Sequence, residues 1–148
     1  NLMTIKGCAV SISYTNTLIN NCTFRNNSAY EKSSKVACPI ITGVALYFRI
    51  DTQHVISCIF ENNNIFSDYL KSSKNGFGIA VCAEYCYRGE YCLFEDCKFI
   101  NNGINTDNYI EGCDIELNLT LAIIRNCEFN IYNKNLYNSI GAIFFTNC

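Results

Sequence analysis

Apolar and polar residues alternate with a period of two in five short stretches of the chain, each of which contains a glycine phrase. One alternating set is apolar or small throughout, which predicts β-strands that turn this set toward a core. Its members are Cys8, Val10, Ile12; Val44, Leu46, Phe48; Ile79, Val81, Ala83; Cys113, Ile115, Leu117; and Gly141, Ile143, Phe145. The opposite set, which we expect to face solvent, is more mixed and includes Ala45, Tyr47, Ala80, Cys82, Glu84, Asp114 and Glu116.

A second phrase, cysteine-any residue-phenylalanine, follows the first four of these stretches. From the third residue of the glycine phrase to this cysteine the count is thirteen in the first, second and fourth copies, and the third copy has four more residues. Four copies of one pattern in 148 residues indicate a repeat protein. The constant spacing therefore belongs to a scaffold, and the variable spacing belongs to a loop.

An apolar residue stands three positions before each of these cysteines, for example Ile19 before Cys22. Residues three apart cannot face the same side of one strand, so a tight turn must lie between them. The residue just before the cysteine is of a type that tolerates left-handed backbone in three of the four repeats. These turn positions are Asn21, Ser57, Asp96 and Asn126.

Three short strands per repeat, one sharp turn and one variable loop predict an all-β fold, a parallel β-helix. We expect a single segment, 1–148, with four full coils and the start of a fifth. The coil boundaries fall near 7–42, 43–77, 78–111, 112–139 and 140–148. Coils stacked about 4.8 Å apart would align equivalent residues as ladders in the core. The ladder residues are Cys22, Cys58, Cys97, Cys127 and Phe24, Phe60, Phe99, Phe129.

These phrases resemble the repeats of the polymorphic membrane protein (Pmp) family, which combine a Gly-Gly-Ala-Ile-like phrase with Phe-x-x-Asn. The second phrase is matched at 24–27, 60–63 and 99–102, whereas 129–132 departs from it, and the first phrase is degenerate. The resemblance implies a right-handed β-helix of the kind also found in pectate lyases. It also implies an extracellular passenger used for surface display and adhesion.

Composition argues against some partners and favours one cellular location. A net charge of −2 gives no reason to expect a nucleic-acid partner, and no apolar run is long enough to insert this segment into a membrane. Eleven cysteines favour an oxidising compartment, and we expect an extracellular or cell-surface location. Twenty-one asparagines suit a fold with many tight turns.

The cysteines allow more than one chemistry. Side chains that point in parallel at about 4.8 Å are wider apart at Cβ than a disulfide prefers, so the ladder pattern favours stacked thiols over disulfides. Cys86 and Cys92, in contrast, flank the enlarged loop of the third repeat and are a candidate disulfide. A zinc site from Cys82, Cys86, Cys92 and Cys97 lacks the usual two-residue spacing. We expect neither a metal nor a cofactor.

Enzymes that cleave acidic polysaccharides use this fold, so clustered acids on an outward face must be considered. The outward positions supply Arg49, Asp51 and Glu84 on one side and Asp114 with Glu116 on another. These are thinly spread, and a solvated face explains them better. The single histidine, His54, we expect to be an ordinary outward residue. We therefore predict no catalytic residues and no enzymatic activity.

Three Asn-x-Ser/Thr sequons occur, at Asn21, Asn26 and Asn118, and all fall at expected turns. In a protein secreted by a eukaryotic cell, Asn118 and Asn26 are the favoured glycosylation sites, because Asn21 sits in a turn packed against neighbouring coils.

One outward column, four residues before the ladder cysteine, holds Leu18, His54, Leu93 and Ile123. An exposed aliphatic column needs a cover. Either the long loops of this chain cover it or Leu18, Leu93 and Ile123 form a lateral contact with another chain.

The ends of the chain carry no evident cap. The chain begins at Asn1 and stops one strand into a fifth repeat, so we expect a piece of a longer protein or a processed product. We expect further coils of the same chain, or identical subunits end to end, to pair with both ends.

The predicted function is a non-catalytic extracellular structural or adhesive segment. A segment or subunit of an extracellular fibre is the alternative, and a carbohydrate-active lyase or hydrolase is a distant third. Glycans are the other candidate partner.

Overall fold

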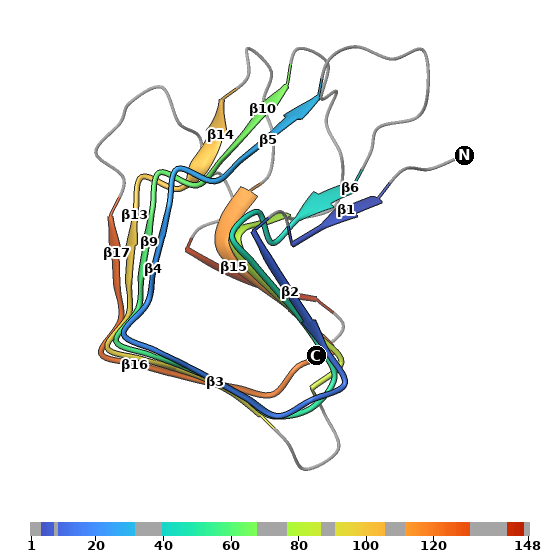
Figure 1. Cartoon of the computed structure of the whole chain (residues 1–148), viewed down its shortest axis with the longest axis vertical. Coiled ribbons are helices and arrows are strands. Elements are labelled where there is room, and N and C mark those ends of the chain that lie inside the picture. The colour runs from blue at the N-terminus through green and yellow to red at the C-terminus, as the bar shows by residue number, and fades with distance from the viewer. Residues whose placement is uncertain are drawn as a thin grey trace.

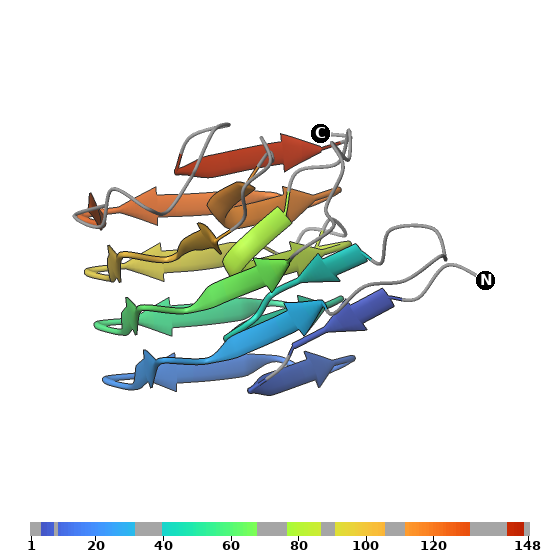
Figure 2. The same ribbon diagram turned by 90° about the horizontal axis from the view of Figure 1, so that it is seen from above.

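The computed structural model describes residues 4–7, 9–31, 40–67, 77–86, 91–105, 112–130 and 142–146. These residues contain eighteen strands and no helix. Every strand pairing among them is parallel, and each joins one repeat to the next (Figures 1 and 2). The predicted all-β fold with stacked parallel strands is therefore confirmed.

Each repeat contributes one strand in turn to a series of sheets. The first sheet has the order β18 (Ile143–Thr146), β15 (Gly112–Asn118), β11 (Phe77–Glu84), β7 (Leu46–Arg49), β2 (Val10–Ser13). The second has the order β16 (Ala122–Arg125), β12 (Cys92–Glu95), β8 (Gln53–Ile56), β3 (Thr17–Asn20). The third has the order β17 (Glu128–Asn130), β13 (Lys98–Ile100), β9 (Ile59–Glu61), β4 (Thr23–Arg25).

Two smaller sheets complete the described part. The fourth sheet has the order β14 (Gly103–Asn105), β10 (Asn64–Ser67), β5 (Ser28–Glu31), and the fifth is the pair β1 (Thr4–Lys6) and β6 (Ile40–Thr42). Seen along the stack, the first three sheets enclose the core on three sides, and the fourth runs out from the corner after the third (Figure 1). This arrangement is compatible with a parallel β-helix.

The predicted turns are confirmed by the backbone. Asn21, Ser57, Asp96 and Asn126 have φ of 52°, 52°, 53° and 53°, in the left-handed region. A second corner, after the third sheet, uses Asn26, Asn62 and Asn101 with φ of 57°, 54° and 51°.

A third corner lies where the variable loop was expected, but its left-handed backbone was not predicted. It follows the first sheet and places Tyr14, Ile50, Tyr85 and Leu119 at φ of 61°, 64°, 66° and 49°. Bulky and branched side chains rarely adopt this conformation, so these residue types do not predict left-handed backbone.

The interior contains two clusters of buried side chains. The larger lies between the first three sheets and includes Leu46, Phe60 and Phe99. The smaller is Ala29, Ile41, Val44, Ile65, Ile79 and Ile104. The predicted inward residues of the second and third repeats, and two of the fourth, are fully buried. They are Val44, Leu46, Phe48, Ile79, Val81, Ala83, Ile115 and Leu117. Phe145 is an exception, with 53% of its side chain exposed, because no described strand covers β18 on its far side.

The prediction that the opposite set faces solvent is wrong for the middle repeats. Ala45 and Ala80 belong to the larger core cluster, because the chain bends at the glycine phrase and regular pairing with the neighbouring repeats begins only at the next residue. Tyr47, Cys82 and Glu84 do project from the other side of the first sheet, but they are buried as well.

Candidate functional site

Side-chain amides of half-buried Asn27 and buried Asn63 and Asn102 form a continuous ladder at the corner between the third and fourth sheets. Asn27 Nδ2 donates to Asn63 Oδ1 (2.8 Å), and Asn63 Nδ2 donates to Asn102 Oδ1 (2.9 Å). The second hydrogens of Asn63 Nδ2 and Asn102 Nδ2 bind the carbonyl oxygens of Phe24 (3.1 Å) and Phe60 (3.0 Å). Asn63 and Asn102 thus each tie their own repeat to the preceding one.

Asp114 ends this ladder. Asn102 Nδ2 donates to Asp114 Oδ1 (3.0 Å), and the aspartate is only 2% exposed. Burial raises the pKa of this carboxyl to about 7, although the hydrogen bond from Asn102 acts in the opposite direction.

The expectation that Asp114 faces solvent is therefore wrong, and the register explains why. Gly78 pairs with Cys113 and Val81 pairs with Ile115, so Asp114 alone lies opposite both Ile79 and Ala80. These two residues are fully buried, one in each core cluster. The fourth repeat lacks one residue at this point, and Asp114 consequently enters the interior.

A second polar group lies on the outer side of the first sheet, beneath the end of β1. Lys6 Nζ contacts both carboxylate oxygens of Glu84 (2.7 and 2.8 Å), and the Tyr47 hydroxyl donates to the same carboxylate (2.6 Å). Burial and the bond to Glu84 raise the pKa of Tyr47. Glu84 was expected on a solvated face, but it is instead the buried acceptor that holds β1 against the sheet.

Glu116 has a comparable role one repeat further along. Its Oε2 accepts from the Thr42 hydroxyl (2.7 Å) and the Gly78 N–H (3.2 Å). Burial raises its pKa, as it does for the neighbouring Cys82 thiol, which is fully buried. Glu116 thereby binds β6 through Thr42.

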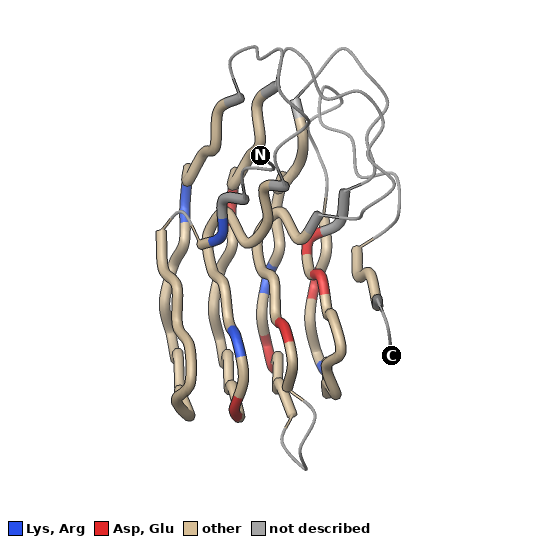
Figure 3. Tube along the Cα trace, turned by 90° about the vertical axis from the view of Figure 1, so that its right-hand side faces the viewer, with Lys and Arg blue, Asp and Glu red and all other residues tan. Residues whose placement is uncertain are grey.

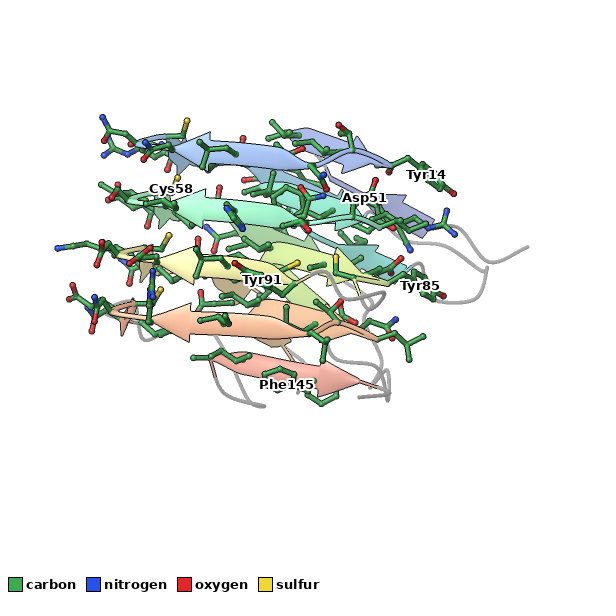
Figure 4. All side chains as sticks on the ribbon, turned by 90° about the horizontal axis from the view of Figure 1, so that it is seen from below. Tyr14, Asp51, Cys58, Tyr85, Tyr91 and Phe145 are labelled. Carbon is green, nitrogen blue, oxygen red and sulfur yellow. The ribbon has the colours of Figure 1, made fainter. Side chains whose placement is uncertain are left out.

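Acidic residues are spread over several repeats (Figure 3), although Glu84 lies close enough to Glu116 to contribute to the raised pKa of that carboxyl. Asp114 lies inside the stack, whereas Glu84 and Glu116 lie outside the first sheet, and both hold the β1–β6 pair. Asp51 lies on the corner after the first sheet, near Tyr14 and Tyr85, which flank that corner in the neighbouring repeats (Figure 4). Arg49 stacks between the rings of these tyrosines, 6.0 Å and 5.6 Å from their centroids.

The ladder cysteines lie in register, and their thiols donate to backbone carbonyls. Cys58 Sγ is 3.2 Å from the Ile56 oxygen, and Cys97 Sγ is 3.2 Å from that of Glu95. The neighbouring thiols of Cys127 and Cys58, together with burial, raise the pKa of Cys97, so this thiol stays protonated. The prediction that Cys22 lies in the core is wrong. Cys22 is exposed, because its repeat is the outermost in the described stack.

The phenylalanine ladder is the most regular feature of the described residues. The rings of Phe24, Phe60, Phe99 and Phe129 follow each other at centroid distances of 4.9, 4.9 and 4.8 Å with planes within 7°. Phe60 and Phe99 are fully buried, whereas Phe24 and Phe129 at the two ends are half-buried.

Cys86 and Cys92 lie close together, with their sulfur atoms 3.3 Å apart. No group of three or more residues suited to hold a metal ion occurs among the described residues, which include all four cysteines considered for zinc.

The three sequon asparagines all lie at or next to corners. Asn21 and Asn26 are exposed in left-handed turns. Asn118 is half-buried at the end of β15, and the hydroxyl of its sequon residue Thr120 donates to the Ala83 oxygen (3.1 Å). Asn21 was expected to be the least favoured glycosylation site because its turn would be packed against neighbouring coils. Its exposure removes this reason.

The proposed lateral column is interrupted. Leu18 and Ile123 are exposed by 62% and 46%, but Leu93 is only 7% exposed, so its expected role in a lateral contact is wrong for this conformation. Leu93 is paired on both sides, by His54 and Ile123. His54 is half-buried, with its ring 5.5 Å from that of Tyr91.

An outward aromatic pair escaped prediction. The rings of Tyr30 and Phe66 stack at 4.8 Å on the fourth sheet, and Tyr30 is exposed. Both residues follow the Phe-x-x-Asn phrase by three positions, which is the signal that could have revealed them.

No protein-family model, curated protein or solved structure matches the chain. Among the described residues there is no helix that could cross a membrane.

Proposed function

We propose that this chain is a segment of a right-handed parallel β-helix that serves as a non-catalytic structural or adhesive element outside the cell. The observation that carries the proposal is the phenylalanine ladder, in which four rings keep one spacing and one orientation over four repeats. Such a ladder requires each repeat to retrace the path of the one before it. Right-handed winding follows the strong general preference of crossover connections between parallel strands.

The extracellular location rests on other features. Eleven cysteines are typical of oxidising compartments, and exposed sequons such as Asn26 suit attached glycans. The resemblance to Pmp repeats supports the same location.

Outward apolar and aromatic side chains could supply adhesive contacts to protein or glycan partners. They are Tyr14, Leu18, Tyr30, Leu121 and Ile123, all of them exposed.

A segment or subunit of an extracellular fibre is the second candidate. It is supported by the half-buried Phe24 and Phe129 at the two ends of the phenylalanine ladder. An added repeat at either end, from this chain or from an identical one, would bury these rings in the same way as Phe60 is buried.

The first test concerns location and adhesion. Antibodies against the segment are expected to label intact, unpermeabilised cells of the source organism, and surface proteolysis should remove the signal. The purified segment should also reduce attachment of these cells to their substratum in a dose-dependent manner. Labelling that appears only after permeabilisation would refute the extracellular assignment.

The second test separates the candidates. Electron microscopy and analytical ultracentrifugation of the purified protein should show short monomers if it is a display segment, and filaments of variable length if it is a fibre subunit. Turnover of an acidic polysaccharide that is lost in Glu84→Gln but kept in Asp51→Asn would overturn both candidates in favour of an enzyme.

A further inference from the structure

Two cysteines bracket the enlarged loop of the third repeat. Cys86 follows β11 and Cys92 begins β12, and the side chains of both are fully buried. The Cys92 thiol donates to the Cys86 sulfur at 3.3 Å. The loop between them, 87–90, lies outside the described residues.

The backbones of the two cysteines are held by one residue of the next repeat. The Leu121 N–H donates to the Cys86 oxygen (2.9 Å), and the Cys92 N–H donates to the Leu121 oxygen (2.9 Å). Both cysteines are therefore positioned by the stacked scaffold on either side of Leu121. The two sulfurs, 3.3 Å apart, would have to approach by about 1.3 Å to reach the bonding distance of about 2.05 Å.

The ladder cysteines have a different geometry. Cys58 and Cys97 each lie one residue before a strand of the third sheet, and these strands, β9 and β13, pair in parallel with about 4.8 Å between neighbours. This separation exceeds the roughly 3.5 to 4.5 Å that a disulfide prefers between Cβ atoms. The Cys97 thiol also donates to the carbonyl oxygens of Val55 (3.4 Å) and Glu95 (3.2 Å), so oxidation would cost it hydrogen bonds.

We propose that Cys86 and Cys92 form a disulfide that closes this loop, and that Cys58, Cys97 and Cys127 remain thiols under the same conditions. The oxidant is a small-molecule disulfide such as oxidised glutathione. One cysteine attacks it to give a mixed disulfide and releases one glutathione thiol. The second cysteine then displaces the other glutathione, so that two protein thiols lose two electrons and two protons, and two glutathione thiols form.

The order of folding and oxidation follows from burial. The thiolate is the attacking species, and the neighbouring Cys86 together with burial raises the pKa of Cys92. The bond therefore forms most readily before folding has buried the two cysteines. Once buried, the disulfide resists reductants that cannot enter the fold.

The test is peptide mapping after refolding. The reduced, unfolded protein is refolded in a glutathione redox buffer, alkylated to block remaining thiols, and digested with trypsin. Cleavage after Arg88 separates Cys86 from Cys92, so the two peptides stay joined only by a disulfide. These peptides also contain Cys82 and Cys97, and fragmentation of the joined pair assigns the bond.

We expect to find the two peptides joined in the wild type and in Cys82→Ala. They should be separate in Cys86→Ser and in Cys92→Ser. In all four proteins Cys58, Cys97 and Cys127 should be alkylated. The wild-type map alone decides the question if a variant does not fold. A bond through Cys82 or Cys97, or alkylation of both Cys86 and Cys92 in the refolded wild type, would overturn the proposal.

Discussion

At the scale of single residues, Asp114 shows how one missing residue changes the chemistry of a position. It occupies the place of two buried apolar residues of the preceding repeat, and its carboxyl ends a ladder of neutral amides. An ionised group there faces Asn102 with no cation among its described contacts. The protonated form is therefore the one that this site favours.

This preference predicts a pH dependence of stability. The pKa of Asp114 is about 7 in the folded protein and near 4 when unfolded, so the unfolded chain releases the proton first as pH rises. The free energy of unfolding should fall between pH 4 and 7, by up to about 4 kcal/mol at 1.36 kcal/mol per pKa unit. Urea denaturation followed by circular dichroism at pH 5 and pH 8 measures the effect.

Asp114→Asn should remove most of this dependence, because the amide stays neutral and still offers an oxygen to Asn102. Glu116, whose pKa is also raised by burial, adds a slope of the same sign, whereas Cys58 and Cys127, whose pKa values are lowered to about 6 and about 7 by the Cys97 thiol, add one of the opposite sign. Asp51→Asn is the matched control and should leave the slope as in the wild type. An unchanged slope in Asp114→Asn would contradict the role assigned to this carboxyl.

At the scale of elements, β1 and β6 are attached to the first sheet by polar contacts that the local sequence does not reveal. Lys6 and Glu84 are 78 residues apart, and Thr42 and Glu116 are 74 apart. Strand, turn and ladder positions could be predicted because they depend on periodicity and on asparagine chemistry, as at Asn21. The burial of Glu84 could not be predicted, because it requires a partner from another repeat. The left-handed backbone of Ile50 could not be predicted either, because a β-branched residue is expected to avoid this conformation.

The β1 attachment can be tested with a double-mutant cycle. Lys6→Met leaves the buried Glu84 carboxylate without its cation and should lower the free energy of unfolding by about 3 kcal/mol. The double variant Lys6→Met with Glu84→Gln should recover part of this loss, because no charge is then left unpaired. Chemical denaturation of all four proteins at one pH gives the coupling energy. Additive losses would show that the two side chains act independently.

At the scale of the whole molecule, stability is expected to depend on position along the stack, since each repeat contacts only its neighbours. Phe60 is covered by rings on both sides and Phe24 on one side. Phe60→Ala should therefore cost about 3–5 kcal/mol of unfolding free energy. Phe24→Ala should cost about 1–2 kcal/mol. Equal losses in urea denaturation would contradict the ladder as a stack of nearest-neighbour contacts.

The direction of the backbone hydrogen bonds has a mechanical consequence. All pairings between repeats run along the stack, so a pull along this axis loads them one after another, and repeats should detach singly rather than together. Each detached repeat releases chain: the 36 residues from Asn27 to Asn63 extend to about 120 Å at roughly 3.3 Å each. A chain held at both ends would thus lengthen in steps at low force and act as an extensible tether.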